Sequence, residues 1–475
     1  MTAIVYRVTV PLVFQEGIRP GAGKDAGNRL AIASDGAGRP VLRGSAIAGA
    51  LRHAYANGLG ARCKADVVSR WFGAPCEERA SRERGKMSPL RVADVLLNGP
   101  PVVRHHNSIN RHTGAVRKGG LFDVEVLAPG TRGTAILELH DDEEDVSMEF
   151  LRQLVGILHG GLVLGGSAAR GVGRAELDGD AKMRRFDLTT VDGHAAFLDE
   201  RYATRDGRLP SNGEKLNANP FAASTLKIGI DLAIPRGQDM LIGDGQGLDY
   251  DIEPQGVVHA NGKGYWRVPG SALRGILRAW VARLAAREGL AVADSVKRFL
   301  ADEKQELQQG DHVAWGWDDA ETRKVKTEAL ADDPSRLKEV VTCPVMRLFG
   351  SAYGKGRVHV SDALSEKTES SAQVRAHVAV DRVTGGANEG FFFKNTVLCH
   401  SPKLRFHVTV TVDRPTEGEA CWLAAAIRAI DRGILRVGSS KGGGRLALAS
   451  PPTAHGHHEK LFTSMQPCEV LHVGH

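Results

Sequence analysis

Two glycine-rich loops of this sequence carry basic residues, a combination suited to holding a phosphate group. The first reads GGSAARGVG at 165–173 and the second VGSSKGGGR at 437–445. Glycine lacks Cβ and readily adopts positive φ, so such a backbone can approach a ligand and turn successive N–H groups toward an anion. The candidate phosphate-binding residues are Gly165, Gly166, Ser167, Arg170, Gly438, Ser439, Lys441 and Arg445. The alternative is a glycine-rich turn into a final strand, and the pattern of a Walker nucleotide-binding loop is absent.

A Gly-Ser pair opens each of two predicted helices, in RPVLRGSAIAGALRHAY (39–55) and YWRVPGSALRGILRAW (265–280). A helix start offers unpaired N–H groups and the positive end of the helix dipole, and serine is a favourable N-cap. The candidate phosphate contacts there are Ser45, Arg52, Ser271, Arg274 and Arg278. A serine that only caps its helix is the competing interpretation.

The elements that must position these residues occur twice along the chain, in one order. Each copy has an opening strand, a Gly-Ser helix, a W/L-F-G segment followed by a short strand, an N/D-R-x-T-G segment, and a final glycine-rich loop. The matched segments are 4–14 with 226–234, 39–55 with 265–280, 71–95 with 348–364, 107–127 with 378–398, and 164–177 with 436–448. The later pairs keep a nearly constant spacing along the chain, whereas the Gly-Ser pair is closer together. This difference predicts an insertion between the helix and the LFG segment of the second copy.

Hydrophobic spacing predicts which faces of these elements are buried. Alternating apolar residues in both opening strands indicate strands with one face in a core. Each Gly-Ser helix has apolar residues on one face. The predicted core residues of the two helices are Ile47, Leu51, Tyr55, Leu273, Leu277 and Val281.

Composition limits the class of protein. Of 475 residues, 42% are hydrophobic and 25% charged, which is typical of a globular chain of about two to four domains. The net charge of +6 permits a polyanionic partner without requiring one. No run of eighteen apolar residues and no signal peptide are evident, so we expect a cytoplasmic protein with no membrane partner. The six cysteines lie far apart without a CxxC pair and are predicted to be reduced thiols.

The repeat divides the chain into two modules and three further segments. We expect a first module at 1–180, a polar connector at 181–223, a second module at 224–450 and a tail at 451–475. The insertion of the second module, at about 285–340, is charged and predicted to be a helical decoration. Three histidines of the tail, His455, His457 and His458, are either solvated or part of a metal site.

The ordered series of motifs resembles the RAMP superfamily, specifically the backbone subunits of type III CRISPR effectors. VPGSALRGILR, VDRVTGGA and the final G-S-x-x-x-G-x-G-R loop of the second half are similar to the family pattern throughout, whereas the first half has Arg43 for a proline and Asn110 for an aspartate. The resemblance implies an α+β fold with two tandem ferredoxin-like palms, similar to RNA-recognition motifs, each with an inserted β-hairpin thumb. A fused double module is similar to subunits of some type III-D complexes.

In this family such hairpins insert between nucleotides of the guide–target duplex and displace a base. The resemblance assigns this role to segments containing His105, His106, Asn107 and Arg111 in the first half and His377, Asp381 and Arg382 in the second. Zinc binding by His105 and His106 with His112 is the alternative, although no nearby cysteine completes a familiar ligand set.

Family members that cut RNA use an aspartate in the loop before the Gly-Ser helix, together with a divalent metal. The resemblance implies that a carboxylate there holds Mg²⁺, orients the scissile phosphate or helps to deprotonate a ribose 2′-OH. The candidate catalytic residues are Asp25 in the first module and Asp249, Asp251 and Glu253 in the second, with Asp251 as the candidate metal ligand. Loop acids that are merely solvated are the alternative.

Three hypotheses follow for the function. The first is a subunit that binds guide (CRISPR) RNA and cleaves paired single-stranded target RNA in a metal-dependent endoribonuclease reaction, next to other type III effector subunits. The second is a scaffold that holds guide RNA without cutting. The third is a metal-independent ribonuclease that processes guide RNA.

Overall fold

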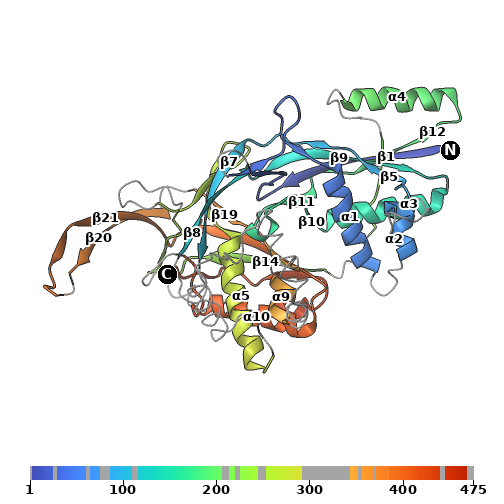
Figure 1. Ribbon diagram of the computed structural model, residues 1–475. Helices are drawn as coiled ribbons and strands as arrows, with labels where there is room; N and C mark the ends of the chain where they lie inside the picture. The colour runs from blue at the N-terminus through green and yellow to red at the C-terminus, as the bar shows by residue number, and fades with distance from the viewer. Residues whose placement is uncertain are drawn as a thin grey trace, which may run out of the picture.

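The computed structural model describes residues 3–24, 29–59, 65–74, 86–109, 116–205, 213–219, 225–243, 253–290, 292, 343–350, 356–367, 371–381, 383–438 and 444–467. It is a mixed α+β structure with two halves, each built on an antiparallel sheet (Figure 1). The helices α1 and α3 of the first half and α5 and α10 of the second lie below their sheets in this view.

The described elements of the first half, in chain order, are β1 (Ile4–Phe14), β2 (Gly21–Lys24), β3 (Leu30–Ile32), β4 (Val41–Leu42), α1 (Gly44–Leu59), α2 (Ala65–Phe72), β5 (Leu90–Val92), β6 (Val95–Leu96), β7 (Pro101–Ile109), β8 (Val116–Leu127), β9 (Thr131–His140), α3 (Glu144–His159), β10 (Leu162–Val163), the 3-10 helix η2 (Ala168–Arg170), β11 (Arg174–Leu177), β12 (Lys182–Asp187), α4 (Val191–Arg205) and β13 (Glu214–Lys215).

Those of the second half are β14 (Thr225–Ala233), β15 (Asp239–Met240), β16 (Gly256–Val258), β17 (Gly264–Val268), α5 (Gly270–Arg287), α9 (Pro344–Phe349), β18 (Val358–Val360), β19 (Ala363–Glu366), β20 (Ala372–Val380), β21 (Ala387–Cys399), β22 (Arg405–Asp413), α10 (Glu417–Asp431), β23 (Ala447–Leu448), β24 (Thr453–His455) and α11 (Lys460–Thr463). Most of the expected insertion at 285–340 lies outside the described residues.

The two sheets share one strand order and one register. In the first, the order across the sheet is β5, β9, β1, β11, and in the second it is β18, β22, β14, β23. Val8 of β1 lies opposite Leu137 of β9, which in turn lies opposite Val92 of β5. The equivalent row of the second sheet is Ile228, Val410 and Val360. The repeat predicted from the motifs therefore extends to the pairing of individual residues.

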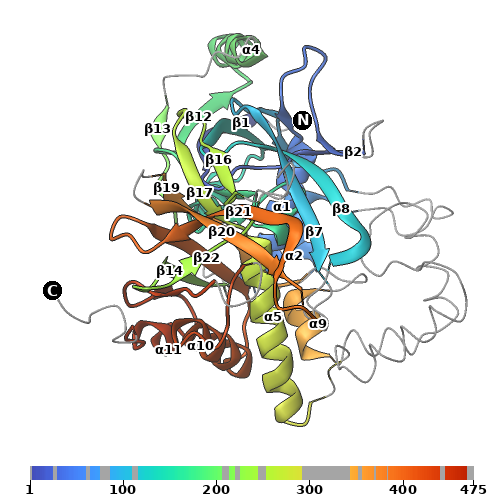
Figure 2. The ribbon, with the colours of Figure 1, turned by 90° about the vertical axis from the view of Figure 1, so that its left-hand side faces the viewer.

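A long β-hairpin is inserted at the same place in each half, between the strand that follows the Gly-Ser helix and the next strand of the sheet. The hairpin β7–β8 pairs Arg104 with Val124 and His106 with Phe122. In β20–β21 the pairs are Arg375 with Asn395 and His377 with Phe393. Both members of each pair are displaced along the chain by the same number of residues, so the hairpins are equivalent position by position. Figure 2 shows both hairpins on the side that faces the viewer.

Each half has its own hydrophobic core between sheet and helices. The inward faces of both opening strands are buried, as their alternation predicted. The predicted helix residues are buried as well, namely Ile47, Leu51, Tyr55, Leu273, Leu277 and Val281. In the first core Phe150 of α3 stacks on Trp71, with ring centroids 4.3 Å apart. The W/L-F-G segments therefore pack under the helices as core residues.

Segments outside the repeat extend both sheets. Within the range expected to be a connector, β12 pairs with β1, and α4 lies on the opposite face of the first sheet from α1 and α3 (Figure 1). Phe186 of β12 packs edge-on against Phe197 of α4, which holds the helix on that face. Within the expected tail, β24 pairs with β14 at the position equivalent to β12. The connector and tail thus contribute ordered strands to the modules.

Candidate functional site

Both Gly-Ser helices begin directly over a strand, at a spacing that only glycine permits. A Cβ on Gly44 would lie 2.0 Å from the carbonyl oxygen of Val92, and one on Gly270 would lie 2.3 Å from that of Val360. Neither position has room for a Cβ. Glycine in the motif therefore allows the strand after the helix to pass directly beneath the helix start.

An aspartate from that strand segment accepts a hydrogen bond from each helix start. The N–H of Gly44 donates to Oδ1 of Asp94 at 2.7 Å, and the N–H of Gly270 donates to Oδ1 of Asp362 at 2.8 Å. A carboxylate at this end of a helix satisfies an otherwise unpaired donor and interacts favourably with the dipole. The hydrogen bond from Gly44 lowers the pKa of Asp94 below its usual value.

The expectation that serine caps these helices is wrong for α5. Its N-cap residue is Pro269, whose side chain makes no capping hydrogen bond. Ser45 and Ser271 are the second residues of their helices; Ser45 is exposed and Ser271 half-buried. Sequence reasoning missed the two aspartates, although both stand at matching places in the repeated segments LRVADV and VHVSDAL.

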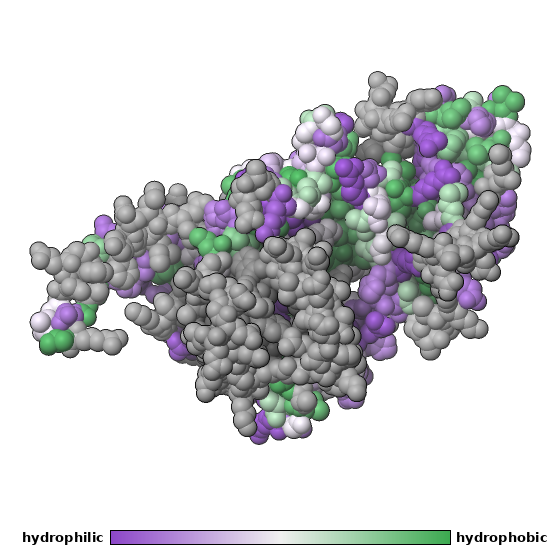
Figure 3. Space-filling view, viewed as in Figure 1, coloured by the Kyte–Doolittle hydropathy of each residue, from purple (hydrophilic) through white to green (hydrophobic). Residues whose placement is uncertain are grey.

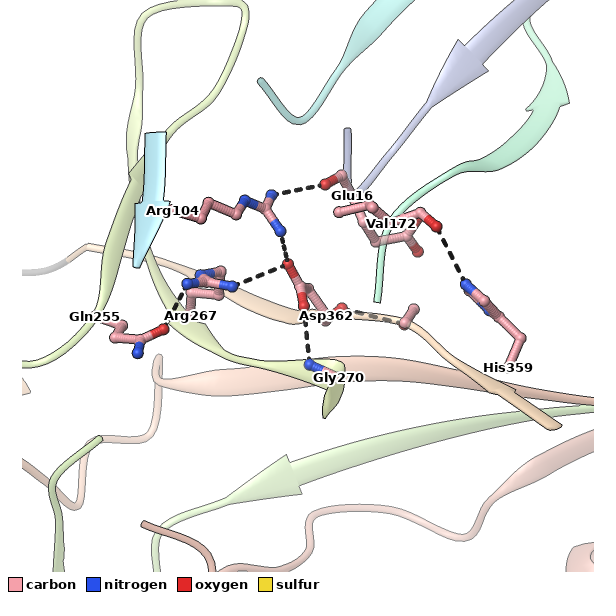
Figure 4. Close-up of polar contacts among 9 residues, drawn as sticks. Glu16, Arg104, Val172, Gln255, Arg267, Gly270, His359 and Asp362 are labelled. Carbon is pink, nitrogen blue, oxygen red and sulfur yellow. Dashed lines mark hydrogen bonds and ion pairs between the residues drawn. The ribbon is translucent and has the colours of Figure 1, made fainter. Parts of the chain in front are cut away.

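Asp362 lies at the junction of the two halves, in a buried ionic cluster (Figure 4). Its Oδ2 accepts from Arg104 of the first hairpin and pairs with Arg267 of β17 at 3.4 Å. The exposed fractions of the Arg104, Asp362 and Arg267 side chains are 3%, 0% and 5%. The N–H of Asp362 donates to the carbonyl oxygen of Gly171 in the first glycine-rich loop at 2.9 Å. One residue of the second half thus binds two segments of the first.

Two further titratable groups are buried beside this cluster. Burial raises the pKa of Glu16 to about 8, and its main-chain oxygen accepts from Arg104 at 3.0 Å. Burial lowers the pKa of His359 to about 4, and its Nε2 lies 3.4 Å from the carbonyl oxygen of Val172. At pH 7 both side chains are therefore largely neutral. Two guanidinium groups then face the single carboxylate of Asp362, so the cluster has a positive balance.

The first glycine-rich loop continues from this cluster to the surface. Gly165 has a φ of +77°, and the N–H of Gly166 donates to the carbonyl oxygen of Arg19 at 2.8 Å. Ser167 has a φ of +64°, and its Oγ accepts from Arg170 at 3.0 Å. Because η2 of this loop lies against α5, the loop of the first half adjoins the Gly-Ser helix of the second.

Arg170 and His106 both contact the ring of Phe122. The Arg170 guanidinium lies 4.9 Å from the ring centroid, and the His106 ring stacks on it at 5.5 Å with an angle of 17° between planes. Burial, together with the charges of Arg267, Arg170 and Arg104, lowers the pKa of His106 to about 3. The junction therefore presents a neutral histidine ring and a stacked arginine next to each other, with Asn107 exposed beside them.

Other predicted residues occupy separate places. Arg52 is exposed on α1, whereas Arg274 binds the carbonyl oxygen of Phe349 and, at 3.4 Å, that of Val358. Burial lowers the pKa of Arg274 to about 10. Arg278 is half-buried on the same helix. Arg274 thus connects α5 to the end of α9 and to β18 through these two hydrogen bonds.

In the second glycine-rich loop, Gly438 has a φ of +114°. Arg445 is half-buried beneath Gly433, where a Cβ would lie 2.6 Å from its Nε. Arg174 lies under Gly161 in the same way, with a corresponding distance of 2.8 Å. Arg174, directly after the first loop, and Arg445, at the end of the second, therefore pack under the turns that end α3 and α10.

Several predicted residues lie outside the described part of the chain. These are Asp25, Asp249, Asp251, Arg111, Arg382, Ser439 and Lys441. Of the candidate catalytic acids only Glu253 is described, and it is exposed. Within the described ranges, no group of three or more His, Cys, Asp or Glu side chains is arranged to hold a metal ion. No helix in these ranges is long and apolar enough to cross a membrane.

The chain matches the model of the RAMP superfamily over residues 11–176 and 239–447. The two matched regions cover most of the chain and coincide with the two structural halves, so the protein belongs to the RAMP superfamily. Membership indicates a CRISPR-associated RNA-binding subunit in a superfamily that includes some endoribonucleases. No curated protein matches the sequence.

Proposed function

We propose that this protein is a guide-RNA-binding backbone subunit of a type III CRISPR effector, in which two RAMP modules lie in series along one RNA. Each sheet has the strand order of a ferredoxin-like palm, in which the opening strand lies between the third and fourth strands of the motif. We interpret β7–β8 and β20–β21 as the thumbs of the two palms. Family membership supports this assignment.

The observation that carries the RNA-binding proposal is the positive balance at the junction. Arg104 and Arg267 face one carboxylate there, Glu16 is largely protonated at pH 7, and Arg170 adds a further positive charge close to the surface. Electrostatic attraction to phosphates supplies most sequence-independent affinity for RNA. Planar faces such as those of Arg170 and His106 suit stacking with unpaired bases.

The second hairpin has the character expected of a thumb that inserts between nucleotides. Its strands expose apolar side chains, namely Val374, Val378, Val380 and Phe392. In the space-filling view the hairpin stands away from the body on the left, with hydrophobic and hydrophilic residues side by side near its tip (Figure 3). Apolar side chains exposed on such a projecting hairpin are more favourably placed against nucleotide bases than in water.

The remaining RNA contacts that we propose come from the helix starts and loops of both modules. In the first module they are Ser45, Arg52, Asn107, Arg111, Gly165, Gly166 and Ser167. In the second they are Ser271, Arg274, Arg278, Arg382, Gly438, Ser439, Lys441 and Arg445. Arg274 and Arg445 are half-buried against the backbone of their own module, so we expect them to shape the site and contribute little direct contact.

A matched pair of substitutions tests RNA binding. Arg170→Glu should weaken binding of guide RNAs of unrelated sequence by about tenfold or more, because phosphate contacts carry little sequence information. The slope of log affinity against log salt concentration should fall by about the amount expected for one phosphate contact. Arg201→Glu is the control, since Arg201 lies over the Phe197 ring of α4 on the opposite face of the first sheet. Fluorescence anisotropy over a range of salt measures both. Equal affinities of the two variants would remove the junction from the RNA interface.

We propose further that the subunit cuts target RNA with a divalent metal, which the family resemblance indicates to be Mg²⁺. This rests on Asp25 in the first module and Asp249, Asp251 and Glu253 in the second, as acids of the loops before the Gly-Ser helices. Asp251→Ala should abolish one target cut and Asp25→Ala a different one, because each acid reaches only the phosphate near its own module.

Mapping of product ends on a guide-paired target, with and without EDTA, distinguishes the alternatives. Loss of single cuts with unchanged guide binding supports a metal-dependent nuclease. Unchanged cutting when each of the four acids is replaced in turn by alanine would leave a non-catalytic scaffold, and cutting of precursor guide RNA in EDTA would indicate a processing ribonuclease.

A further inference from the structure

A buried guanidinium group at the junction has donors that no described residue accepts. Arg174, the first residue of β11, is 2% exposed, and its Nε, Nη1 and Nη2 atoms all lack a hydrogen-bond partner within the described part of the chain. Its Nη2 lies 2.9 Å from Oε1 of Glu176, but this ion pair does not have the geometry of a hydrogen bond. Because buried polar groups of folded proteins almost always have partners, these donors indicate a site for a ligand.

Glu16 lies next to Arg174 and also has an unpaired oxygen. The N–H of Gly173, directly before Arg174, donates to the carbonyl oxygen of Gly17, directly after Glu16, at 2.9 Å. Glu16 is 8% exposed, and its Oε2 has no hydrogen-bond partner in the described ranges. Burial raises the pKa of Glu16 to about 8, against an opposing effect of Arg174. At pH 7 the carboxyl group is therefore largely protonated and can donate a hydrogen bond.

The second module closes this space through β18. The Nε2 atom of His359, which is 7% exposed, lies 3.4 Å from the carbonyl oxygen of Val172, two residues before Arg174. Burial, and also the charge of Arg174, lowers the pKa of His359 to about 4, so its ring is neutral at pH 7. Figure 4 shows Glu16, Val172 and His359 together on one side of Asp362. The unpaired donors therefore lie where the two modules meet.

Charge decides between water and an anion as the ligand. Two carboxylates serve four basic side chains here, in the ion pairs of Asp362 with Arg104 and Arg267 and of Glu176 with Arg174 and Lys227. Water would satisfy the donors of Arg174 but would leave this surplus of positive charge, and an uncompensated charge in a protein interior is strongly destabilising. A monovalent anion satisfies the donors and balances the charge.

We propose that a small monovalent inorganic anion, such as chloride, binds between Arg174 and Glu16 at the closed junction and stabilises the docked arrangement of the two modules. Arg174 donates to the anion through its guanidinium group, and Glu16 donates through its O–H. A phosphate of RNA is not the ligand, because a polynucleotide needs an accessible surface and these two side chains are 2% and 8% exposed. The inference does not depend on the proposed RNA binding.

Thermal unfolding at a constant sodium concentration tests whether the folded protein binds the anion. In nuclease-treated, full-length protein, chloride is increased in exchange for gluconate, which is too large for a closed site. A ligand that binds only the folded state stabilises it in proportion to the logarithm of its concentration. The unfolding midpoint should therefore rise by about 1–2 °C for each tenfold increase in chloride above the dissociation constant. A midpoint that is independent of chloride overturns the proposal.

Two arginine variants separate this site from general effects of salt. Arg174→Met keeps a side chain of similar length without the donors, and it should abolish the dependence of the midpoint on chloride. Arg445→Met is the matched control, because Arg445 has the equivalent place under Gly433 in the second module but is half-buried. It should respond to chloride like the wild type. Equal chloride dependence in Arg174→Met and the wild type contradicts the proposal.

Glu176→Gln gives a test in the opposite direction, which decides if Arg174→Met fails to fold. Glu176 is 32% exposed and is the ion-pair partner of Arg174. Removal of its charge leaves the guanidinium group to the anion, so chloride should bind about threefold more tightly or better. The chloride dependence should then begin at a lower concentration. Binding that is unchanged or weaker in Glu176→Gln overturns the proposal.

Bromide locates the site directly. Crystals of the wild-type protein grown with bromide in place of chloride should show an anomalous-scattering peak within hydrogen-bonding distance of the Arg174 guanidinium group. Peaks confined to the protein surface, or no peak, would overturn the proposal whatever the stability measurements show. All of these experiments use protein without RNA, so their outcome is independent of the test of RNA binding.

Discussion

Asp94 and Asp362 begin from the same local structure and end in different environments. Both lie after the strand that follows a Gly-Ser helix, and both accept from the first glycine of that helix. Asp94 keeps a surface pair with Arg43, whereas Asp362 is fully buried between Arg104 and Arg267. The difference arises because the first hairpin covers the second module, whereas no segment among the described residues covers the first in this way. A motif that is structural in one half is therefore also an interface in the other.

The largest expected effect is on stability at Asp362. Asp362→Ala leaves two buried guanidinium groups without their carboxylate, which typically costs about 3–5 kcal/mol. Asp94→Ala removes a partly exposed cap and should cost about 1 kcal/mol. Urea unfolding followed by circular dichroism measures both. Similar losses in the two variants would mean that the burial of Asp362 contributes little, and the contrast between the halves would fail.

The next effect tests where the halves are alike. Gly44→Ala and Gly270→Ala each force a Cβ toward a backbone carbonyl oxygen that is about as close in both halves, at 2.0 and 2.3 Å. Both should destabilise by about 2 kcal/mol or more, since the strand beneath must move. Gly49→Ala is the control, because a Cβ at Gly49 of α1 meets open space. It should be neutral or slightly stabilising.

The pH dependence of the unfolding free energy should come from Glu16, which is buried beside the Asp362 cluster. Burial raises the folded-state pKa of Glu16 to about 8, above its ordinary value of 4.5. The native state therefore favours the protonated form, and this contribution is complete below about pH 4.5 and is lost as pH rises toward 8. Glu16→Gln, which cannot ionise, should reduce the fall in unfolding free energy between pH 5 and 8. An unchanged slope would show that other groups determine it.

The smallest effect is expected at Arg43. Its pair with Asp94 is exposed, with 57% of the arginine side chain accessible, and such pairs usually contribute less than about 1 kcal/mol. Arg43→Ala should change the unfolding free energy by about 0.5 kcal/mol or less, measured as above. A loss as large as that of Asp362→Ala would mean that Arg43 already replaces the missing hairpin arginine.

The fold was more accessible from the sequence than the site. The strand faces and the helix residues Ile47, Leu51, Leu273 and Leu277 followed from periodicity, because burial of apolar side chains depends on local spacing. The match of motifs also predicted the order of elements in each half. The strands added by the connector and the tail, β12 and β24, were missed, because polar segments at a sheet edge carry little periodicity.

The junction could not be predicted because it depends on long-range packing. Nothing near Arg104 in the sequence distinguishes a buried interface arginine from a solvated one, and its partner lies in the other module. Asp362 carried a signal, its recurrence in both copies as Asp94, but a repeated aspartate is a common turn residue. The sequence pattern favoured the serine of the motif as the functional residue at the helix start, since serine is a frequent N-cap.

The contact of Arg104 with Asp362 also gives the molecule a polarity. The first module contributes its hairpin and its glycine-rich loop to the junction, and the second contributes its helix start, so exchanging the modules would not reproduce the same surface. An RNA strand also has two chemically different ends. If an RNA strand runs along both modules, it meets their elements in a fixed order. Its two possible orientations on this protein are therefore not equivalent.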